Sequence, residues 1–169
     1  MLAALVHRPT VGSLAVPWVT LSTPDGRHLF GTVDAERQDR ALHLRLCQIC
    51  GESLQRRIVF AMRHGDIVRM LSPEAGKHPW CAMYSARACP MLAGAMTHYR
   101  ASSQIPKAPE GFTIRTFAGT GSREAARADT YHQVWATHFR PSVDPVTRRW
   151  AALVIPDWIV RIRPMRRSA

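Results

Sequence analysis

Lysine is nearly absent from this chain, which has only Lys77 and Lys107 among its 23 basic residues. The other 21 are arginines and only 12 residues are acidic, so the formal net charge is +11 at pH 7. Such a charge favours acidic partners, with nucleic acid ahead of an anionic membrane. A GC-rich coding genome also replaces lysine by arginine, so a merely basic surface or a protein partner is an equal alternative.

Long apolar runs are missing as well. No stretch approaches the roughly 20 residues that a membrane-spanning helix needs. The apolar residues 1–6 have no basic segment before them and are ended by Arg8 and Pro9, unlike a secretory signal. We therefore expect a cytoplasmic protein without a membrane partner. In such a compartment, four cysteines indicate a metal site rather than a disulfide framework.

Three of the cysteines and one histidine form two pairs of equal spacing. Two residues separate Cys47 from Cys50, and after 27 further residues the same gap separates His78 from Cys81. Tetrahedral zinc takes four thiolate or imidazole ligands, and a two-residue gap lets one tight turn present two of them. Gly51 suits the backbone of such a knuckle. We predict that these four residues bind a structural Zn²⁺ ion, with iron in a similar site or no metal as alternatives.

Cys89 does not fit this set easily. It follows Cys81 by eight residues, about two helical turns or roughly 12 Å along a helix. It could replace His78 as an alternative metal ligand only if the helix broke between the two cysteines. Otherwise Cys89 is a buried core cysteine or a reactive thiol.

The remaining pattern predicts an α+β fold with a β-rich C-terminal part. Residues 16–23 and 28–33 read as a hairpin around the turn at 24–26, and Asp34 is a suitable N-cap for a helix at 35–43. Residues 57–63 and 66–71 read as a second hairpin, and Pro79 as the first residue of a helix that Pro90 stops. Further strands are expected at 112–117, 131–140, 150–155 and 158–162, with a polar helix or loop at 122–129.

Three segments follow from this reading, although all of them are compatible with one domain. Residues 1–45 form an N-terminal hairpin and short helix, and residues 46–100 contain the metal ligands. Residues 101–111, rich in Pro, Ser and Gly, read as a linker to the β-rich segment 112–169.

The order of knuckle, hairpin and helix with two ligands in its first turn resembles the treble-clef zinc finger over residues 47–91. The motifs Cys-x-x-Cys-Gly, His-x-x-Cys-Ala and Ser-Ala-x-Ala-Cys-Pro are also similar to a group of small uncharacterised proteins of actinobacteria and their phages. The matching positions are Cys47, Cys50, Gly51, His78, Cys81, Ala82, Ser85, Ala86, Ala88, Cys89 and Pro90. The resemblance implies a structural metal and a helix packed through Ala86 and Cys89, but no activity.

Treble clefs also underlie the His-Me finger nucleases, which place a catalytic histidine on the hairpin. His64 is a weak candidate for that role because it falls in the predicted hairpin turn beside Asp66. The histidine doublet of that family is missing, and the helix after Cys81 offers no His or Asn. His132 and His138 share one face of a predicted strand, but they lie about 20 Å apart and cannot share a metal. No catalytic set can be assembled, and we lean against an enzyme.

Arginines cluster on the segment after the knuckle and at the C-terminus. Arg161 and Arg163 alternate with apolar residues, so a strand presents both on one side. We expect nucleic acid, or a nucleoprotein assembly, to be bound without catalysis. A protein-interaction or assembly module of phage or mobile-element origin is the alternative, and a His-Me finger type nuclease comes third. The candidate nucleic-acid-binding residues are Arg56, Arg57, Arg63, Arg161, Arg163, Arg166 and Arg167.

Overall fold

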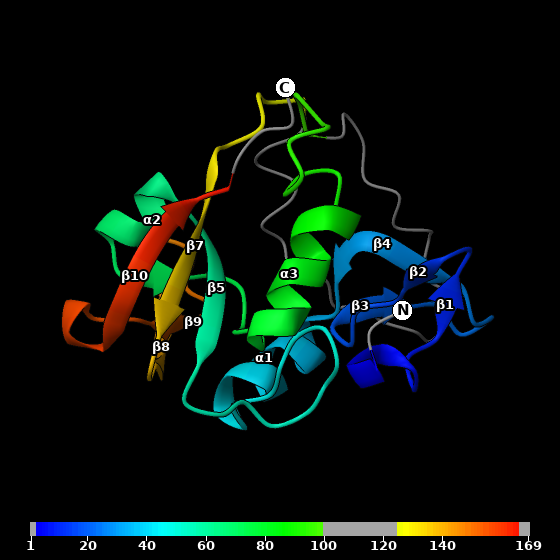
Figure 1. The fold of residues 1–169 in the computed structure, drawn as a ribbon, viewed down its shortest axis with the longest axis horizontal. Helices are drawn as coiled ribbons and strands as arrows, with labels where there is room; N and C mark the ends of the chain where they lie inside the picture. Colours follow the sequence, from blue (N-terminus) through cyan, green and yellow to red (C-terminus); the bar gives the residue numbers. More distant parts are fainter. Residues whose placement is uncertain (1–2, 100–124, 166–169) are drawn as a thin grey trace.

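The computed structural model of the chain describes residues 3–99 and 125–165 (Figure 1). Its N-terminal part has five short elements followed by a helix, and the helix confirms the prediction for residues 35–43. Asp34 is the N-cap, and its Oδ1 accepts a hydrogen bond of 3.0 Å from the Arg37 N–H. These elements are η1 (Ala3–Leu5), β1 (Thr10–Val11), β2 (Leu14–Ala15), β3 (Thr20–Ser22), β4 (His28–Val33) and α1 (Ala35–His43).

The rest of the described chain alternates strands with short helices. The elements are β5 (Ile58–Arg63), α2 (His64–Val68), β6 (Leu71–Ser72), α3 (Pro79–Ala88), β7 (Tyr131–Ala136), β8 (Arg140–Val143), β9 (Trp150–Leu153), η3 (Pro156–Trp158) and β10 (Ile159–Pro164). They confirm a mixture of helices and strands with a β-rich C-terminal part. The expected strand at 112–117 and the linker at 101–111 lie outside the described residues.

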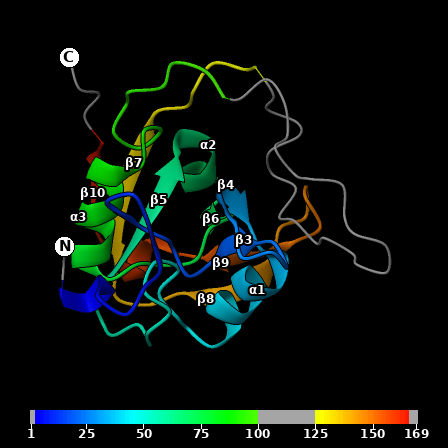
Figure 2. The same cartoon turned by 90° about the vertical axis from the view of Figure 1, so that its right-hand side faces the viewer.

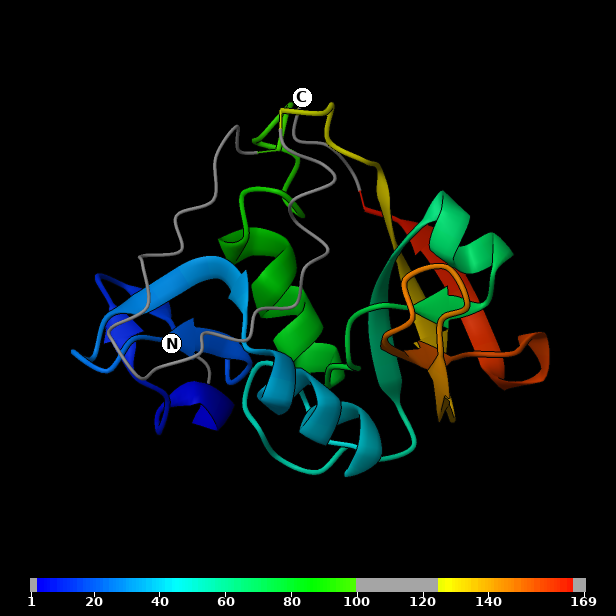
Figure 3. The same ribbon diagram turned by 180° about the vertical axis from the view of Figure 1, so that it is seen from behind.

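Two three-stranded sheets form the centre of the fold. One has the order β10-β7-β5 and the other β6-β9-β8, and every pairing in them is antiparallel. Phe60 and Val134 lie opposite each other on one face of the first sheet. The ring of Phe60 packs edge-on against the ring of Phe139, with 5.5 Å between the ring centroids. Figure 2 shows α1 beside β8 and β9. Seen from behind, α3 lies between the β3–β4 hairpin and the β10-β7-β5 sheet (Figure 3).

The predicted hairpin of residues 57–63 and 66–71 is wrong. Strand β5 pairs along its whole length with β7, and β6 pairs with β9. Residues His64–Val68 are helical because Asp66 caps the helix start, where its Oδ2 accepts the Arg63 N–H at 3.0 Å. The β-branched run around Ile67 resembled a strand, but the capping contact and the distant partner β7 decide the local structure.

The predicted strand at 131–140 is confirmed as β7 over Tyr131–Ala136, but it does not continue to residue 140, because the chain turns a corner between β7 and β8. Phe139 is 1 % exposed at this corner, so burial of its ring favours the bend. After the corner, β8 pairs with β9, and the Asp144 carboxylate accepts the N–H of Val146 at 2.9 Å in the connecting turn. His132 therefore lies in β7 whereas His138 lies beyond its end.

Candidate metal centre

Four side chains from two distant parts of the chain meet in the protein interior. Cys47, Cys50, His78 and Cys81 are all buried, and one ligand atom from each lies within 4.8 Å of all the others. The His78 Nδ1 is 3.4 Å from the Cys50 Sγ. The sequence therefore predicted the grouping of these residues, and their donor atoms are compatible with a metal site.

The first pair lies on a tight turn that its own backbone closes. The Gly51 N–H donates to the Cys47 carbonyl at 2.8 Å, and the Cys47 N–H donates to the Glu52 carbonyl at 2.8 Å. Gly51 has φ +86°, in the left-handed region that glycine adopts without steric cost. A Cβ atom there would lie 2.6 Å from Cδ1 of Trp18. Both the turn and the close approach of Trp18 therefore require glycine.

The second pair is positioned by the start of α3. His78 is the N-cap, Pro79 is the first helical residue and Cys81 lies in the first turn. Proline suits this place because it has no N–H to leave unsatisfied and its φ is fixed near the helical value. The unpaired N–H groups and the partial positive charge at a helix start also stabilise a nearby thiolate.

The ring of His78 is fixed in orientation by contacts that the sequence did not reveal. Its Nε2 lies 3.0 Å from the Ser53 carbonyl, so Nε2 carries the proton and donates it there. This leaves Nδ1 as the lone-pair nitrogen facing the sulfurs, as histidine ligands of metals commonly require. Trp80 stacks on the same ring at 4.7 Å with an interplanar angle of 6°.

The N-terminal segment holds the knuckle from a second side. Trp18 and Val19 donate their N–H groups to the carbonyls of Ile49 and Gln48, at 2.9 and 3.2 Å. The Gln48 N–H in turn donates to the Gly76 carbonyl at 3.1 Å. Backbone contacts of this kind have no side-chain signature, so no pattern in the sequence indicates them.

The close approach of the sulfurs perturbs their acidity. Hydrogen bonds from Cys50 and Cys81 hold the pKa of the Cys47 thiol far below its usual value. The same contact with Cys47 raises the pKa of Cys81 and of Cys50. The hydrogen bond with Cys47 also raises the pKa of His78. These contacts thus favour a thiolate at Cys47, and the thiolate is the form of cysteine that binds metal cations.

Cys89 lies at the opposite end of α3 from this four-residue cluster. It is the C-cap residue of that helix, and its N–H donates to the Ser85 carbonyl at 2.9 Å. The helix is continuous between Cys81 and Cys89, so the break that Cys89 needs in order to replace His78 is not present. Cys89 is half-buried and is not a member of the four-residue cluster.

The candidate nucleic-acid-binding arginines fall into different environments. Arg56 and Arg57 are exposed in the loop before β5, and Arg161 and Arg163 are exposed on β10. Arg166 and Arg167 lie outside the described residues.

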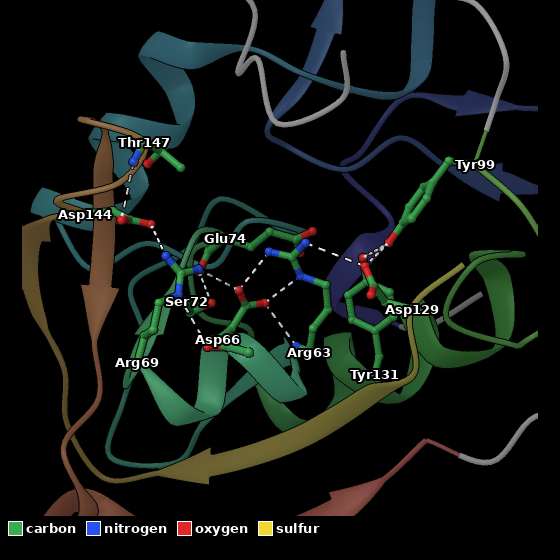
Figure 4. Close-up of polar contacts among 11 residues, drawn as sticks. Arg63, Asp66, Arg69, Ser72, Glu74, Tyr99, Asp129, Tyr131, Asp144 and Thr147 are labelled. Atoms are coloured by element: carbon green, nitrogen blue, oxygen red, sulfur yellow. Dashed lines mark hydrogen bonds and ion pairs between the residues drawn. The ribbon is translucent and has the colours of Figure 1, made fainter. Parts of the chain in front are cut away.

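Arg63 instead belongs to a partly buried ion-pair network (Figure 4). Its Nη2 is 2.7 Å from Oδ1 of Asp66, a residue that is 1 % exposed, and its Nη1 is 3.6 Å from Oδ2 of Asp129. The hydrogen bond with Asp66 raises the pKa of Arg63. Arg69 bridges Asp66 and Asp144, at 3.2 and 2.9 Å. Arg63 therefore pairs with carboxylates of the protein itself, whereas Arg56, Arg57, Arg161 and Arg163 are exposed to solvent.

His64 is the first residue of α2 and is exposed. It is not at a hairpin turn, so the placement on which its weak candidacy for nuclease chemistry rested is wrong. In residues 3–99 and 125–165, the cysteine cluster is the one group of three or more His, Cys, Asp or Glu side chains arranged to hold a metal.

Comparison with known proteins adds no family assignment. No protein-family model matches the chain, and neither the curated proteins nor the solved structures contain a significant match to it. Among the described helices, none has the length and apolar character needed to span a bilayer.

Proposed function

We propose that the chain binds one zinc ion through Cys47, Cys50, His78 and Cys81, and that this ion is structural. The observation that carries the proposal is the convergence of three sulfurs and one imidazole nitrogen in a buried cluster. Three cysteines and one histidine are a common ligand set of structural zinc, and four protein ligands fill a tetrahedral shell without leaving a position for substrate. The ion would join the knuckle to the start of α3.

A treble-clef-like arrangement around this ion is part of the same proposal. The knuckle is followed by β5, and the chain returns beside β5 just before α3. There Val59 and Lys77 exchange two backbone hydrogen bonds of 2.9 Å. This pairing supports the treble-clef order of knuckle, paired strands and ligand-bearing helix. Helix α2 and strand β6 are inserted between the two paired segments.

Elemental analysis of the purified protein tests the metal. We expect about one zinc per chain, and Cys50→Ser should lose the metal and lower the melting temperature because a structural site contributes its binding free energy to folding. Cys89→Ala is the matched control and should retain the zinc. Full zinc content in Cys50→Ser would remove Cys50 from the ligand set, and iron in place of zinc would contradict the identity of the ion.

For the molecular role, we propose that the protein binds nucleic acid without catalysis. The support is the net charge of +11 together with exposed arginines on the loop before β5 and on β10. Arginine contacts to phosphates release condensed counterions, so affinity should fall steeply as salt rises. The alternative remains a protein-interaction or assembly module in which the basic charge only reflects composition.

Fluorescence anisotropy with labelled DNA and RNA across a salt series distinguishes these roles. Replacing Arg161, Arg163, Arg166 and Arg167 together by Gln should weaken binding and flatten the salt dependence. On duplex DNA the logarithmic slope should fall by about 0.9 for each phosphate that the variant no longer neutralises. Failure of the intact protein to bind either nucleic acid at low salt would favour the assembly module. Metal-dependent cleavage that His64→Ala abolishes would instead establish a nuclease.

A further inference from the structure

A groove lies between the end of α3 and the outer strand β10. It has a volume of about 550 Å³ and is open to solvent, and Figure 2 shows α3 and β10 on the same side of the molecule. Its size falls in the range of about 300–1,000 Å³ that is usual for small-ligand sites. The lining residues are Ala86, Leu92, Gln133, Arg163, Pro164 and Met165.

The register of the sheet places a second arginine on the groove side. Arg163 lies opposite Gln133 and Arg161 opposite Trp135 in the β10–β7 pair. Residues directly opposite each other in an antiparallel pair point to the same face, and residues two apart on a strand do so as well. Arg161, Arg163, Gln133 and Trp135 therefore share the face that borders the groove.

Arg161 is stacked on an aromatic ring rather than paired with a carboxylate. Its guanidinium carbon lies 4.1 Å from the centroid of the Trp135 ring. Stacking on Trp135 orders the planar guanidinium, and the exposure of Arg161 leaves room for another ring on the solvent side. Planar arginine side chains arranged in this way are stacking partners for unpaired bases.

The groove also has the charge that a nucleic acid requires. None of its six lining residues is acidic. Within the described part of the chain, neither Arg161 nor Arg163 forms an ion pair, whereas Arg63 and Arg69 each contact two carboxylates. Arg163 thus retains its guanidinium donors for a phosphate at the groove, because no carboxylate among the described residues pairs with it.

We propose that this groove binds an unpaired nucleotide of a single-stranded nucleic acid. The base lies against the guanidinium of Arg161 on its Trp135 support, the phosphate contacts Arg163, and the amide of Gln133 meets the polar edge of the base. A base within a duplex is stacked on its neighbours and cannot reach the guanidinium, so the site selects single strands. This inference rests on the proposed binding of nucleic acid and specifies its form and its site.

The test compares a labelled single-stranded 12-mer with the matching duplex by anisotropy at low salt. We expect tighter binding of the single strand. Arg161→Lys keeps the charge but loses the planar group, so it should weaken single-strand binding at least about fivefold and change duplex binding little. Arg163→Ala should weaken single-strand binding as well. Arg27→Gln, which removes one charge on the β3–β4 turn across α3 from the groove, is the matched control.

The outcomes separate the two levels of the proposal. No binding of either oligonucleotide by the wild-type protein contradicts the proposed function itself. Binding with duplex preference, or wild-type affinity in Arg161→Lys, contradicts the groove site while nucleic-acid binding stands. Melting curves establish that each variant is folded. Trp135→Phe keeps an aromatic ring beneath Arg161, so this variant should retain most of the single-strand affinity.

Discussion

At the scale of single residues, the knuckle depends on Gly51 as much as on its cysteines. The position combines φ +86° with a Trp18 ring so close that no side chain fits. Trp18 belongs to the N-terminal segment, whose backbone also bonds to the knuckle. Gly51 thus allows the turn that presents Cys47 and Cys50. It also allows Trp18, about 30 positions earlier in the chain, to pack against that turn.

Replacing Gly51 by Ala should lower the free energy of unfolding by about 2–4 kcal/mol, since it adds left-handed strain to overpacking against Trp18. Gly26→Ala is the control, because Gly26 has φ +83° but no atom within 4 Å of the added Cβ. Its cost should be near 1 kcal/mol, the strain alone. Urea unfolding of both variants measures their losses in unfolding free energy. Equal losses would show that the Trp18 ring moves aside without cost, which would contradict the overpacking.

At the scale of secondary structure elements, helix α2 is stabilised by Asp66. This carboxylate accepts the Arg63 backbone N–H at the start of the helix, and it also accepts hydrogen bonds from the side chains of Arg63 and Arg69. The arginines on either side of the helix are thus held by one buried anion (Figure 4). A charge in this position is stabilising only while all its partners are present.

Asp66→Asn should therefore destabilise the protein by about 3 kcal/mol, because it removes the buried carboxylate that Arg63 and Arg69 share and leaves Arg63 with only the more exposed Asp129. Asp129→Asn is the comparison: its side chain is 43 % exposed and 3.6 Å from Arg63, so it should cost less than about 1 kcal/mol. Chemical denaturation with both variants gives the two values. Similar losses of unfolding free energy in the two variants would contradict a larger contribution from the buried Asp66 carboxylate.

At the scale of the whole molecule, Arg69 and Asp144 join α2 to the β8–β9 turn, 75 residues away in sequence. Burial alone would raise the pKa of Asp144, but the N–H groups of Val146 and Thr147 and the Arg69 guanidinium outweigh it and hold that pKa below its usual value. A carboxyl with a depressed folded pKa stabilises the protein fully above its unfolded pKa, about 4. The stabilisation is lost as the pH falls through the folded pKa.

The difference in unfolding free energy between the wild-type protein and Asp144→Asn should therefore be constant from pH 7 to pH 5 and shrink below about pH 4. Urea titrations at each pH measure it, with metal content followed in parallel because protonation of the thiolates would also release the proposed metal ion. A difference that persists unchanged to the lowest pH at which the protein folds would contradict the role of the Asp144 charge.

The sequence by itself determined those features that depend on neighbouring residues. The Cys-x-x-Cys-Gly knuckle, the Asp34 cap of α1 and the Pro79 start of α3 each follow from contacts within a few positions, so their patterns were sufficient. Because the Cys47/Cys50 and His78/Cys81 pairs have equal spacing, their meeting in one cluster could also be predicted.

Only the tertiary structure decided which strands pair and which arginines stay free. The partner of β5 is β7, whose paired positions lie 68 to 78 residues further along the chain, and no local pattern in residues 58–63 specifies it. The sequence marked both Arg63 and Arg161 as candidate nucleic-acid-binding residues. In the structure Arg63 contacts the buried Asp66, whereas Arg161 stacks on Trp135. The physical reason is that pairing and charge neutralisation depend on what a side chain meets across the fold, whereas caps and turns are made by adjacent residues.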